Sequence, residues 1–164
     1  MGTDGTRVWQ YCKPVAEHEL DARLRSLLTF LADKKAGRRF LSRSDIDPAE
    51  LKSLLGNILL VDVVPQPDGG LRFRYRLFGT EFVFYHGADL TGRWLDDIPN
   101  SGFREELLTL YRLVATEGTM RTLSYDYIIE RQRQRFQAVL LPLSGDGKTV
   151  DIVLGCGVPV AGPE

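Results

Sequence analysis

The chain has 164 residues, the size of one ordinary domain, and is long enough to bury an apolar core without disulfides or metals. Its 21 basic and 22 acidic side chains give a net charge of −1, so we expect binding neither to nucleic acid nor to an anionic membrane. Cys12 and Cys156 match no metal-ligand or disulfide-framework spacing. No apolar run is long enough to span a bilayer, and residues 1–16 lack the apolar centre of a signal peptide, so a cytoplasmic location is expected.

The N-terminal third predicts a tail followed by helices. Residues 1–16 are rich in glycine and polar groups and predict a flexible tail. Leucines recur at helical spacing in residues 17–36, which predicts an amphipathic helix (Leu20, Leu24, Leu27, Leu28 and Leu31). We expect this leucine stripe to pack on the outer face of a sheet, with a second copy of the chain as the alternative. Asp47-Pro48-Ala49-Glu50 carries N-cap, first-turn proline and capping-box signals for a second helix, so residues 17–56 form a helical cap.

Two strands should follow as a hairpin. Residues 58–64 are almost all apolar, as in a strand covered on both faces. After the turn at residues 65–70, residues 71–78 alternate between apolar and cationic side chains, the period of a half-buried strand. The apolar set is Leu71, Phe73, Tyr75 and Leu77, and the cationic set is Arg72, Arg74 and Arg76. We expect the arginine side to be solvated or paired with acids.

The hairpin leads into a glycine-punctuated loop. Gly79 ends the strand, and residues 80–86 predict one short helix with Thr80 as its N-cap. Gly87 and Gly92 bound a turn before Trp94 returns the chain to a core.

The C-terminal half predicts one helix and three strands. The helix spans residues 103–116 and the strands span residues 120–130, 135–143 and 150–160. Residues 161–164 form a short C-terminal tail. The expected order is two helices, a hairpin with a short helix after it, another helix and three more strands. This order indicates an α+β domain with one antiparallel sheet.

The loop sequence carries a family resemblance. A strand, Gly79-Thr80, one helical turn and Gly87-Ala-Asp-Leu-Thr-Gly-Arg93 resemble the second strand and following loop of a PAS domain. The chain is most similar to a bacterial family of single-domain PAS-like proteins common in alphaproteobacteria, from about Glu17 to Pro159. It departs from that family near Thr29, where an aromatic-Trp pair is usual, and at Leu41, where proline is usual.

This resemblance implies a five-stranded antiparallel sheet with helices on one face, plus an N-terminal amphipathic helix, in a single domain over residues 17–160. The order of elements also suits an NTF2-like cone, and the loop resemblance favours the PAS fold.

Residues for catalysis or cofactor binding are sparse. His86 and Asp89 are close enough for a base oriented by a carboxylate, but no activated nucleophile accompanies them. No His, Cys, Asp or Glu grouping has metal-ligand spacing. Heme-binding PAS relatives carry a histidine on the helix matching residues 103–116, and flavin-binding relatives carry an Asn-Cys-Arg motif; neither occurs here. We therefore expect no enzyme activity, no metal and no cofactor. Cys156 is in phase with apolar neighbours and should be buried.

A candidate ligand site comes from the aromatic residues. If Phe73, Tyr75 and Leu77 face inward, they meet aromatic side chains from the helices and form an apolar enclosure with phenol groups. The candidate ligand-binding residues are Phe73, Tyr75, Phe82, Tyr85, Trp94 and Tyr111. Such an enclosure would suit a small, mainly apolar metabolite, and an ordinary close-packed core is the alternative.

The sequence therefore favours a stand-alone sensory or regulatory domain that binds a small molecule, a partner protein or both, with no attached output domain. Its output would pass through a homodimer or a separate signalling protein. A purely structural dimerisation module with a packed core is the alternative. A third hypothesis, an NTF2-like cavity enzyme, needs a buried carboxylate of raised pKa beside a tyrosine; Asp62 and Asp126 are the candidates, but strand alternation permits their exposure.

Overall fold

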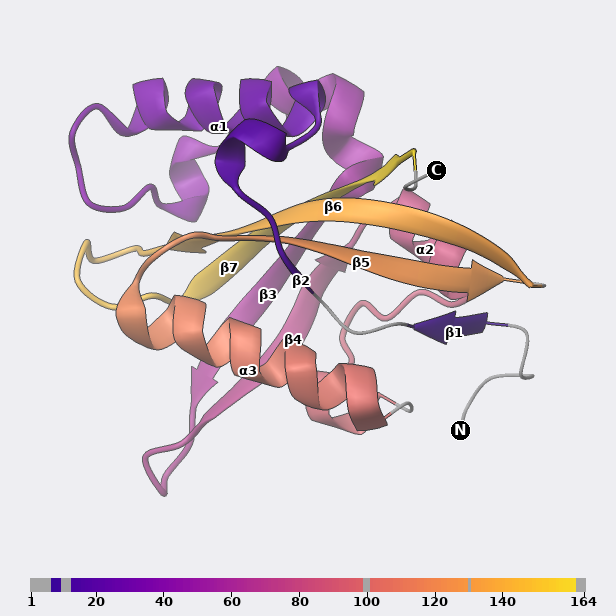
Figure 1. The fold of residues 1–164 in the computed structure, drawn as a ribbon. Helices are drawn as coiled ribbons and strands as arrows, with labels where there is room; N and C mark the ends of the chain where they lie inside the picture. The colour runs from indigo at the N-terminus through magenta and orange to yellow at the C-terminus, as the bar shows by residue number, and fades with distance from the viewer. Residues whose placement is uncertain (1–6, 10–12, 99–100, 130, 162–164) are drawn as a thin grey trace.

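The computed structural model describes residues 7–9, 13–98, 101–129 and 131–161. Within these residues seven strands form one antiparallel sheet in the order β1-β5-β6-β7-β3-β4, with β2 also paired to β5 (Figure 1). The strands are β1 (Arg7–Trp9), β2 (Lys13–Pro14), β3 (Ile58–Pro65), β4 (Leu71–Phe78), β5 (Arg121–Ile129), β6 (Gln132–Leu143) and β7 (Ile152–Val160). The α+β class is confirmed, and the five expected strands are β3 to β7.

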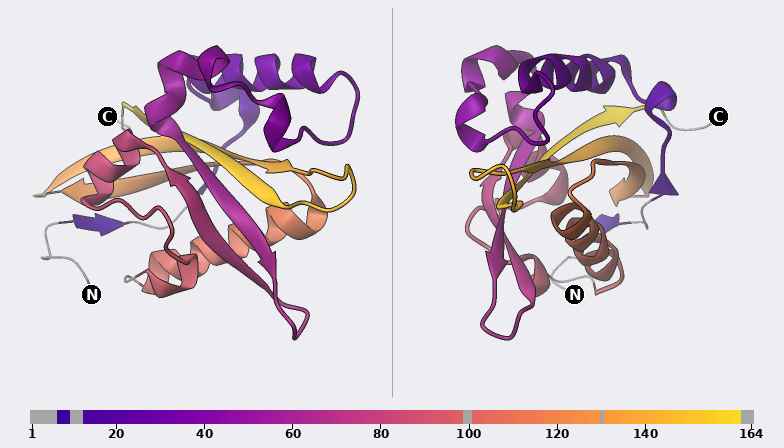
Figure 2. Two further views of the ribbon diagram at one scale, coloured as in Figure 1. Left: turned by 180° about the vertical axis from the view of Figure 1, so that it is seen from behind. Right: turned by 90° about the vertical axis from the view of Figure 1, so that its left-hand side faces the viewer.

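Helices cover both faces of the sheet (Figures 1 and 2). They are η1 (Glu17–Glu19), α1 (Ala22–Lys35), η2 (Arg43–Asp45), η3 (Pro48–Asn57), α2 (Thr80–His86), η4 (Leu95–Asp97) and α3 (Ser101–Glu117). We call the face under α1 and η3 the outer face, and the face under α2, η4 and α3 the inner face. The N-terminal helical cap and the other helices thus lie on opposite faces of the sheet.

The leucine stripe of α1 packs within the chain. Leu24, Leu27 and Leu31 are buried in a cluster with outward side chains of β3, β6 and β7, including Leu60, Val139 and Leu154. Cys156 belongs to this cluster, so its expected burial is confirmed. The expectation that α1 packs on the outer face of the sheet is therefore confirmed.

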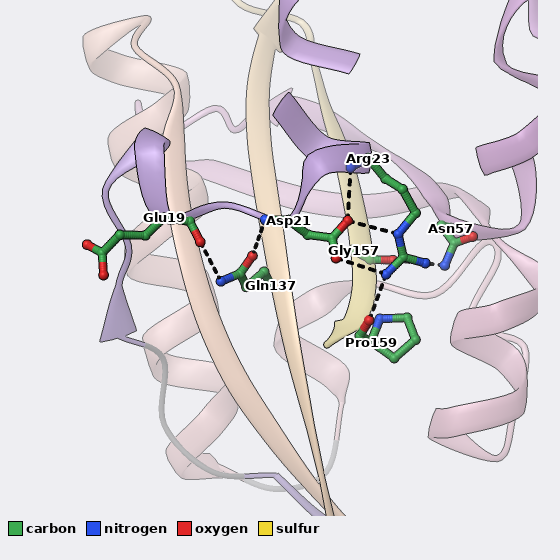
Figure 3. Close-up of polar contacts among 7 residues, drawn as sticks. All are labelled: Glu19, Asp21, Arg23, Asn57, Gln137, Gly157 and Pro159. Atoms are coloured by element: carbon green, nitrogen blue, oxygen red, sulfur yellow. Dashed lines mark hydrogen bonds and ion pairs between the residues drawn. The ribbon is translucent and has the colours of Figure 1, made fainter. Parts of the chain in front are cut away.

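Side-chain hydrogen bonds fix the start of α1 on the sheet (Figure 3). The side-chain amide of Gln137 makes two hydrogen bonds: its Oε1 accepts from the Asp21 backbone N–H at 2.6 Å, and its Nε2 donates to the Glu19 carbonyl at 3.1 Å. Arg23 pairs with the Asp21 carboxylate at 2.9 Å and donates to the Pro159 carbonyl at 2.8 Å. These bonds connect the entry into α1 to β6 and to the end of β7.

A β-bulge changes the side-chain phase of β4. Leu60 of β3 pairs with Leu77, but Val61 pairs with Tyr75, so Arg76 is an extra residue in β4. As a result Leu77 points outward and is 41% exposed, while Phe78 turns into the inner core. The expectation of an inward Leu77 is wrong because strict alternation does not continue through a bulge.

Other segments of the chain pair with parts of the outer strands β4 and β5, which reduces their open hydrogen-bonding edges. At β4, the Gly92 N–H donates to the Tyr75 carbonyl at 2.7 Å, and the Tyr75 N–H donates to the Arg93 carbonyl at 3.0 Å. At the other edge β1 and β2 pair with β5, so these parts of the expected flexible tail are strands. Residues 1–6, 10–12 and 162–164 of the expected tails lie outside the described residues.

Two helix starts refine the sequence expectations. The Asp47 side chain accepts from the Ala49 N–H at 2.9 Å, as its N-cap role predicts, although the segment that follows is a 3-10 helix with non-helical backbone at Leu51. The N-cap of α2 is Gly79 rather than Thr80, and Thr80 is the first helical residue.

Candidate functional site

An apolar cavity of about 60 Å³ lies between the inner face of the sheet and the helices that cover it. Its walls include Phe82 from α2, Leu95 from η4, Leu107 and Tyr111 from α3, and Leu123 from β5. These side chains belong to the inner core or pack against it. The cavity therefore lies in the centre of the inner layer.

Two glycines of β7 lie beneath this layer, where the strand has no inner side chains of its own. Leu154, Cys156 and Val158 of β7 point to the outer core, so Gly155 and Gly157 occupy the inner positions of the strand. A Cβ atom at Gly155 would lie 2.5 Å from Leu59 Cδ1, and one at Gly157 would lie 3.0 Å from Phe82 Cζ. The glycines thus let inner side chains approach the β7 backbone.

The sequence reasoning missed these glycines, although a signal was present. Gly155-Cys156-Gly157 interrupts an otherwise apolar strand, and glycine inside a strand often marks close approach of a ligand or another chain segment.

The structure places three of the six candidate residues in the cavity wall: Tyr75, Phe82 and Tyr111. Phe73 is buried behind the wall, with its ring 5.8 Å from the ring of Tyr111. Tyr85 is half-buried beside the wall and packs edge-on against Phe136, with ring centres 4.7 Å apart. A ligand role for all five of these residues remains a prediction.

Trp94 lies on the other side of β4. It forms a bridge with Arg74, and residues paired in this way point to the same face of a sheet. The guanidinium carbons of Arg72 and Arg74 lie 4.1 and 5.3 Å from its ring centre, in cation–π contact. The expected inward orientation of Trp94 is therefore corrected: the segment that covers the β4 edge directs it outward.

The cavity wall contains few ionisable groups. Burial raises the pKa of Tyr75, so its phenol stays protonated and neutral at physiological pH. Arg104 borders the cavity and donates to the Ile98 carbonyl at 3.1 Å. His86 also borders the cavity, with its ring edge-on to Phe78 at 5.9 Å. The wall is therefore mainly apolar, and it has polar groups at only a few points.

Asp89 has a local structural role. Its carboxylate accepts from the Thr91 backbone N–H at 2.9 Å and from the Thr91 hydroxyl at 2.7 Å, and both bonds lower its pKa. The Thr91 hydroxyl oxygen in turn accepts from the Phe78 N–H at 3.2 Å. Asp89 therefore helps fix the loop against the end of β4.

The arginine side of β4 was expected to be either solvated or paired with acids, and the structure shows that it is paired with acids. Arg72 binds Asp96 with two hydrogen bonds of 2.9 and 2.8 Å, and Arg76 binds Asp62 at 2.8 Å. On β5, Asp126 accepts from Arg135 at 2.9 Å. Asp62 and Asp126 are buried by these contacts, so the expectation of their exposure is wrong.

Both buried acids lie on the outer face. Asp62 sits between Val61 and Val63, and Asp126 sits between Tyr125 and Tyr127, and all four of these neighbours belong to the inner core. Within the described ranges no carboxylate borders the inner cavity. The cavity-enzyme hypothesis therefore loses the two carboxylates on which it depended. In the same part of the chain no cluster of three or more His, Cys, Asp or Glu could hold a metal ion.

Comparisons with known proteins place this geometry in a family. No curated protein matches the chain. No helix of the described residues is long and apolar enough to cross a membrane. The family model of the PAS domain matches residues 21–158, which spans α1, the cavity and the outer core. PAS domains are in general sensory or interaction modules. With the antiparallel sheet, the helices around the inner cavity and this match over most of its length, the chain belongs to the PAS domain family.

Proposed function

We propose that this protein is a regulatory PAS module whose inner cavity binds a small, mainly apolar molecule, and whose response passes to a separate protein or to a second copy. The observation that carries the proposal is the cavity itself, which lies between the inner face of the sheet and the side chains of α2, η4 and α3. We place the module in the cytoplasm as part of this proposal, because its two cysteines have no disulfide-framework spacing.

The cavity volume limits the ligand. Ligand pockets commonly have roughly 300–1,000 Å³, and one water molecule occupies about 30 Å³ in the liquid. A cavity of about 60 Å³ is far below the common pocket range and therefore accepts only a small apolar group. A larger metabolite requires α2 or the η4 segment to move outward.

Strand β7 gives a route from the cavity to the outer face. Its inner positions, Gly155 and Gly157, lie next to the cavity wall, while Leu154 and Val158 pack in the outer core with α1. A ligand that shifts β7 would therefore shift the packing under α1. Because Arg23 bonds the Pro159 carbonyl, the start of α1 would follow the end of the strand.

Native mass spectrometry of the full chain, purified under mild conditions, tests the proposal. We expect a reproducible small-molecule adduct, which denaturing extraction then identifies. Ala138→Met, which fills the cavity from β6, should remove the adduct, whereas Ala49→Met on the exposed surface of η3 should retain it. An adduct-free wild-type spectrum, or an adduct that is equal in both variants, would contradict ligand binding in this cavity.

A purely interacting module is a second candidate, supported by one observation. Phe84 of α2 is 69% exposed, so its ring is available for contact with a partner. Light scattering of wild type and Phe84→Ser tests this candidate. A dimer that Phe84→Ser converts to monomer would support it, and a wild-type monomer at high concentration would argue against self-association.

A further inference from the structure

A second hollow lies on the outer face, under α1. Figure 2 shows α1 crossing this face above the sheet. The hollow has a volume of about 230 Å³. Its helical wall is formed by Leu28, Leu31, Ala32 and Lys35 of α1, and its floor includes Leu141 of β6 and Leu154 of β7. We call this hollow the α1 groove.

The spacing of the α1 residues explains why the groove is unfilled. Leu28, Ala32 and Lys35 follow the i, i+4, i+7 pattern and share one side of the helix, next to the buried stripe of Leu24 and Leu27. Ala32 contributes only a methyl group, which leaves space between the helix and the floor. Leu28 remains partly exposed as a result. The chain thus leaves an apolar surface open at this position.

Two cations border the groove. Lys35 and Arg39 form no ion pair within 4.0 Å with any described residue, whereas their neighbours Lys34 and Arg38 pair with Glu50 and Asp45. The Arg39 guanidinium carbon lies 4.7 Å from the ring centre of Phe40, which gives that side chain a defined position.

Other charges at the groove are few. Glu17 is the acid in the described wall, so two cations face one carboxylate. The backbone carbonyls of Lys34 and Lys35 at the end of α1 accept hydrogen bonds from Arg38. The described border of the groove thus carries two cations and one carboxylate, which is a net positive charge.

We infer that the α1 groove binds a free, straight-chain aliphatic carboxylate, with its chain on the leucine floor and its carboxylate between Lys35 and Arg39. A guanidinium fork matches a carboxylate geometrically, and an ammonium adds a second charge. With a volume of about 230 Å³, the groove is several times larger than the inner cavity and has room for a medium-length chain such as that of octanoate. This site is distinct from the inner cavity, because the sheet separates the two.

Calorimetric titration of the full chain with octanoate tests the inference. We expect saturable binding, at least tenfold weaker binding of octan-1-ol, and no measurable binding of butyrate. Lys35→Gln and Arg39→Gln should each weaken octanoate binding at least fivefold, since each removes a cation at the carboxylate. Ala32→Leu fills the groove from an exposed helical position and should abolish binding.

Two control variants separate this site from others. Lys52→Gln removes an exposed cation of η3 outside the groove, and Ala138→Met fills the inner cavity; neither should change octanoate affinity. Circular dichroism melts confirm that each variant is folded. Three results would each overturn the inference. The first is no binding of octanoate by wild type, and the second is equal affinity for octanoate and octan-1-ol. The third is binding that Ala138→Met removes and Ala32→Leu preserves. The last result would still agree with a ligand in the inner cavity.

Discussion

Gly79 is predicted to tolerate no side chain, because the backbone of a neighbouring segment fills the space where its Cβ would be. A Cβ atom there would lie 2.4 Å from the Gly56 carbonyl oxygen and 2.5 Å from the Ile58 carbonyl oxygen. Ordinary contacts at such an atom are 3.4–4 Å. Gly79→Ala therefore requires the β4–α2 junction and the η3–β3 junction to separate by about 1 Å.

The cost of this separation should be large. Extra methyl groups that meet adjustable side chains in a core cost about 1–3 kcal/mol. The two oxygens at Gly79 belong to the backbone and cannot rotate away, so we expect Gly79→Ala to lower the free energy of unfolding by about 3 kcal/mol or more. For a domain of this size the melting temperature should fall by roughly 6–12 °C. The same change should loosen α2, which carries Phe82 into the cavity wall.

Urea denaturation of wild type and two alanine variants measures the effect. Gly92→Ala is the matched control: Gly92 has φ +86° but no atom within 4 Å of the Cβ position, so only backbone strain of about 1 kcal/mol is expected. If Gly79→Ala destabilised the protein no more than Gly92→Ala, the close packing of the two junctions would be refuted.

Three further predictions follow from local contacts. Gln137→Ala removes the hydrogen bonds to the Asp21 N–H and the Glu19 carbonyl, so we expect the free energy of unfolding to fall by about 1–2 kcal/mol. Hydrogen exchange at the start of α1 should become faster, and unchanged exchange there would contradict the bridging role. The Asp146 carboxylate accepts two backbone N–H groups and a hydroxyl in turn 144–149, which lowers its pKa from 3.8 to about 2. Its contribution to the turn should be complete above pH 3.8 and lost as the pH falls through about 2, and a carboxyl NMR titration with an ordinary pKa would disprove this. Burial raises the pKa of the Cys156 thiol to about 12, so labelling mapped to its peptide at pH 8 should require unfolding, and rapid labelling of native protein would contradict its burial.

Periodicity and turn residues were sufficient to predict the main elements. The α2 bounds agree with the residues expected between Gly79 and Gly87, and α1 and β3 to β7 lie within a few residues of their expected ranges. These elements have strong signals because their buried positions recur at a fixed period. The positions of β1 and β2 were not predictable in the same way, since three- and two-residue strands have no period to detect.

The errors at the site come from pairings between distant segments. Leu77 points outward because of a bulge opposite β3, and Trp94 points outward because it pairs with Arg74. Neither partner is identified by the local sequence. Asp62 and Asp126 are buried by arginines from neighbouring strands, which a pattern within one strand does not reveal. By contrast, Tyr75, Phe82 and Tyr111 follow their local periodicity and line the cavity.

The central claim, a space on the inner face that an apolar molecule can occupy, is tested most directly with xenon. Crystals of the full chain under xenon pressure should show a xenon atom within contact distance of Leu107, Tyr111 and Leu123, because dry apolar cavities bind xenon. Ala138→Met crystals should show none at that position. If xenon occupied other sites in wild-type crystals but none were found between α3 and the sheet, the account would be contradicted. That result would indicate a fully packed inner core.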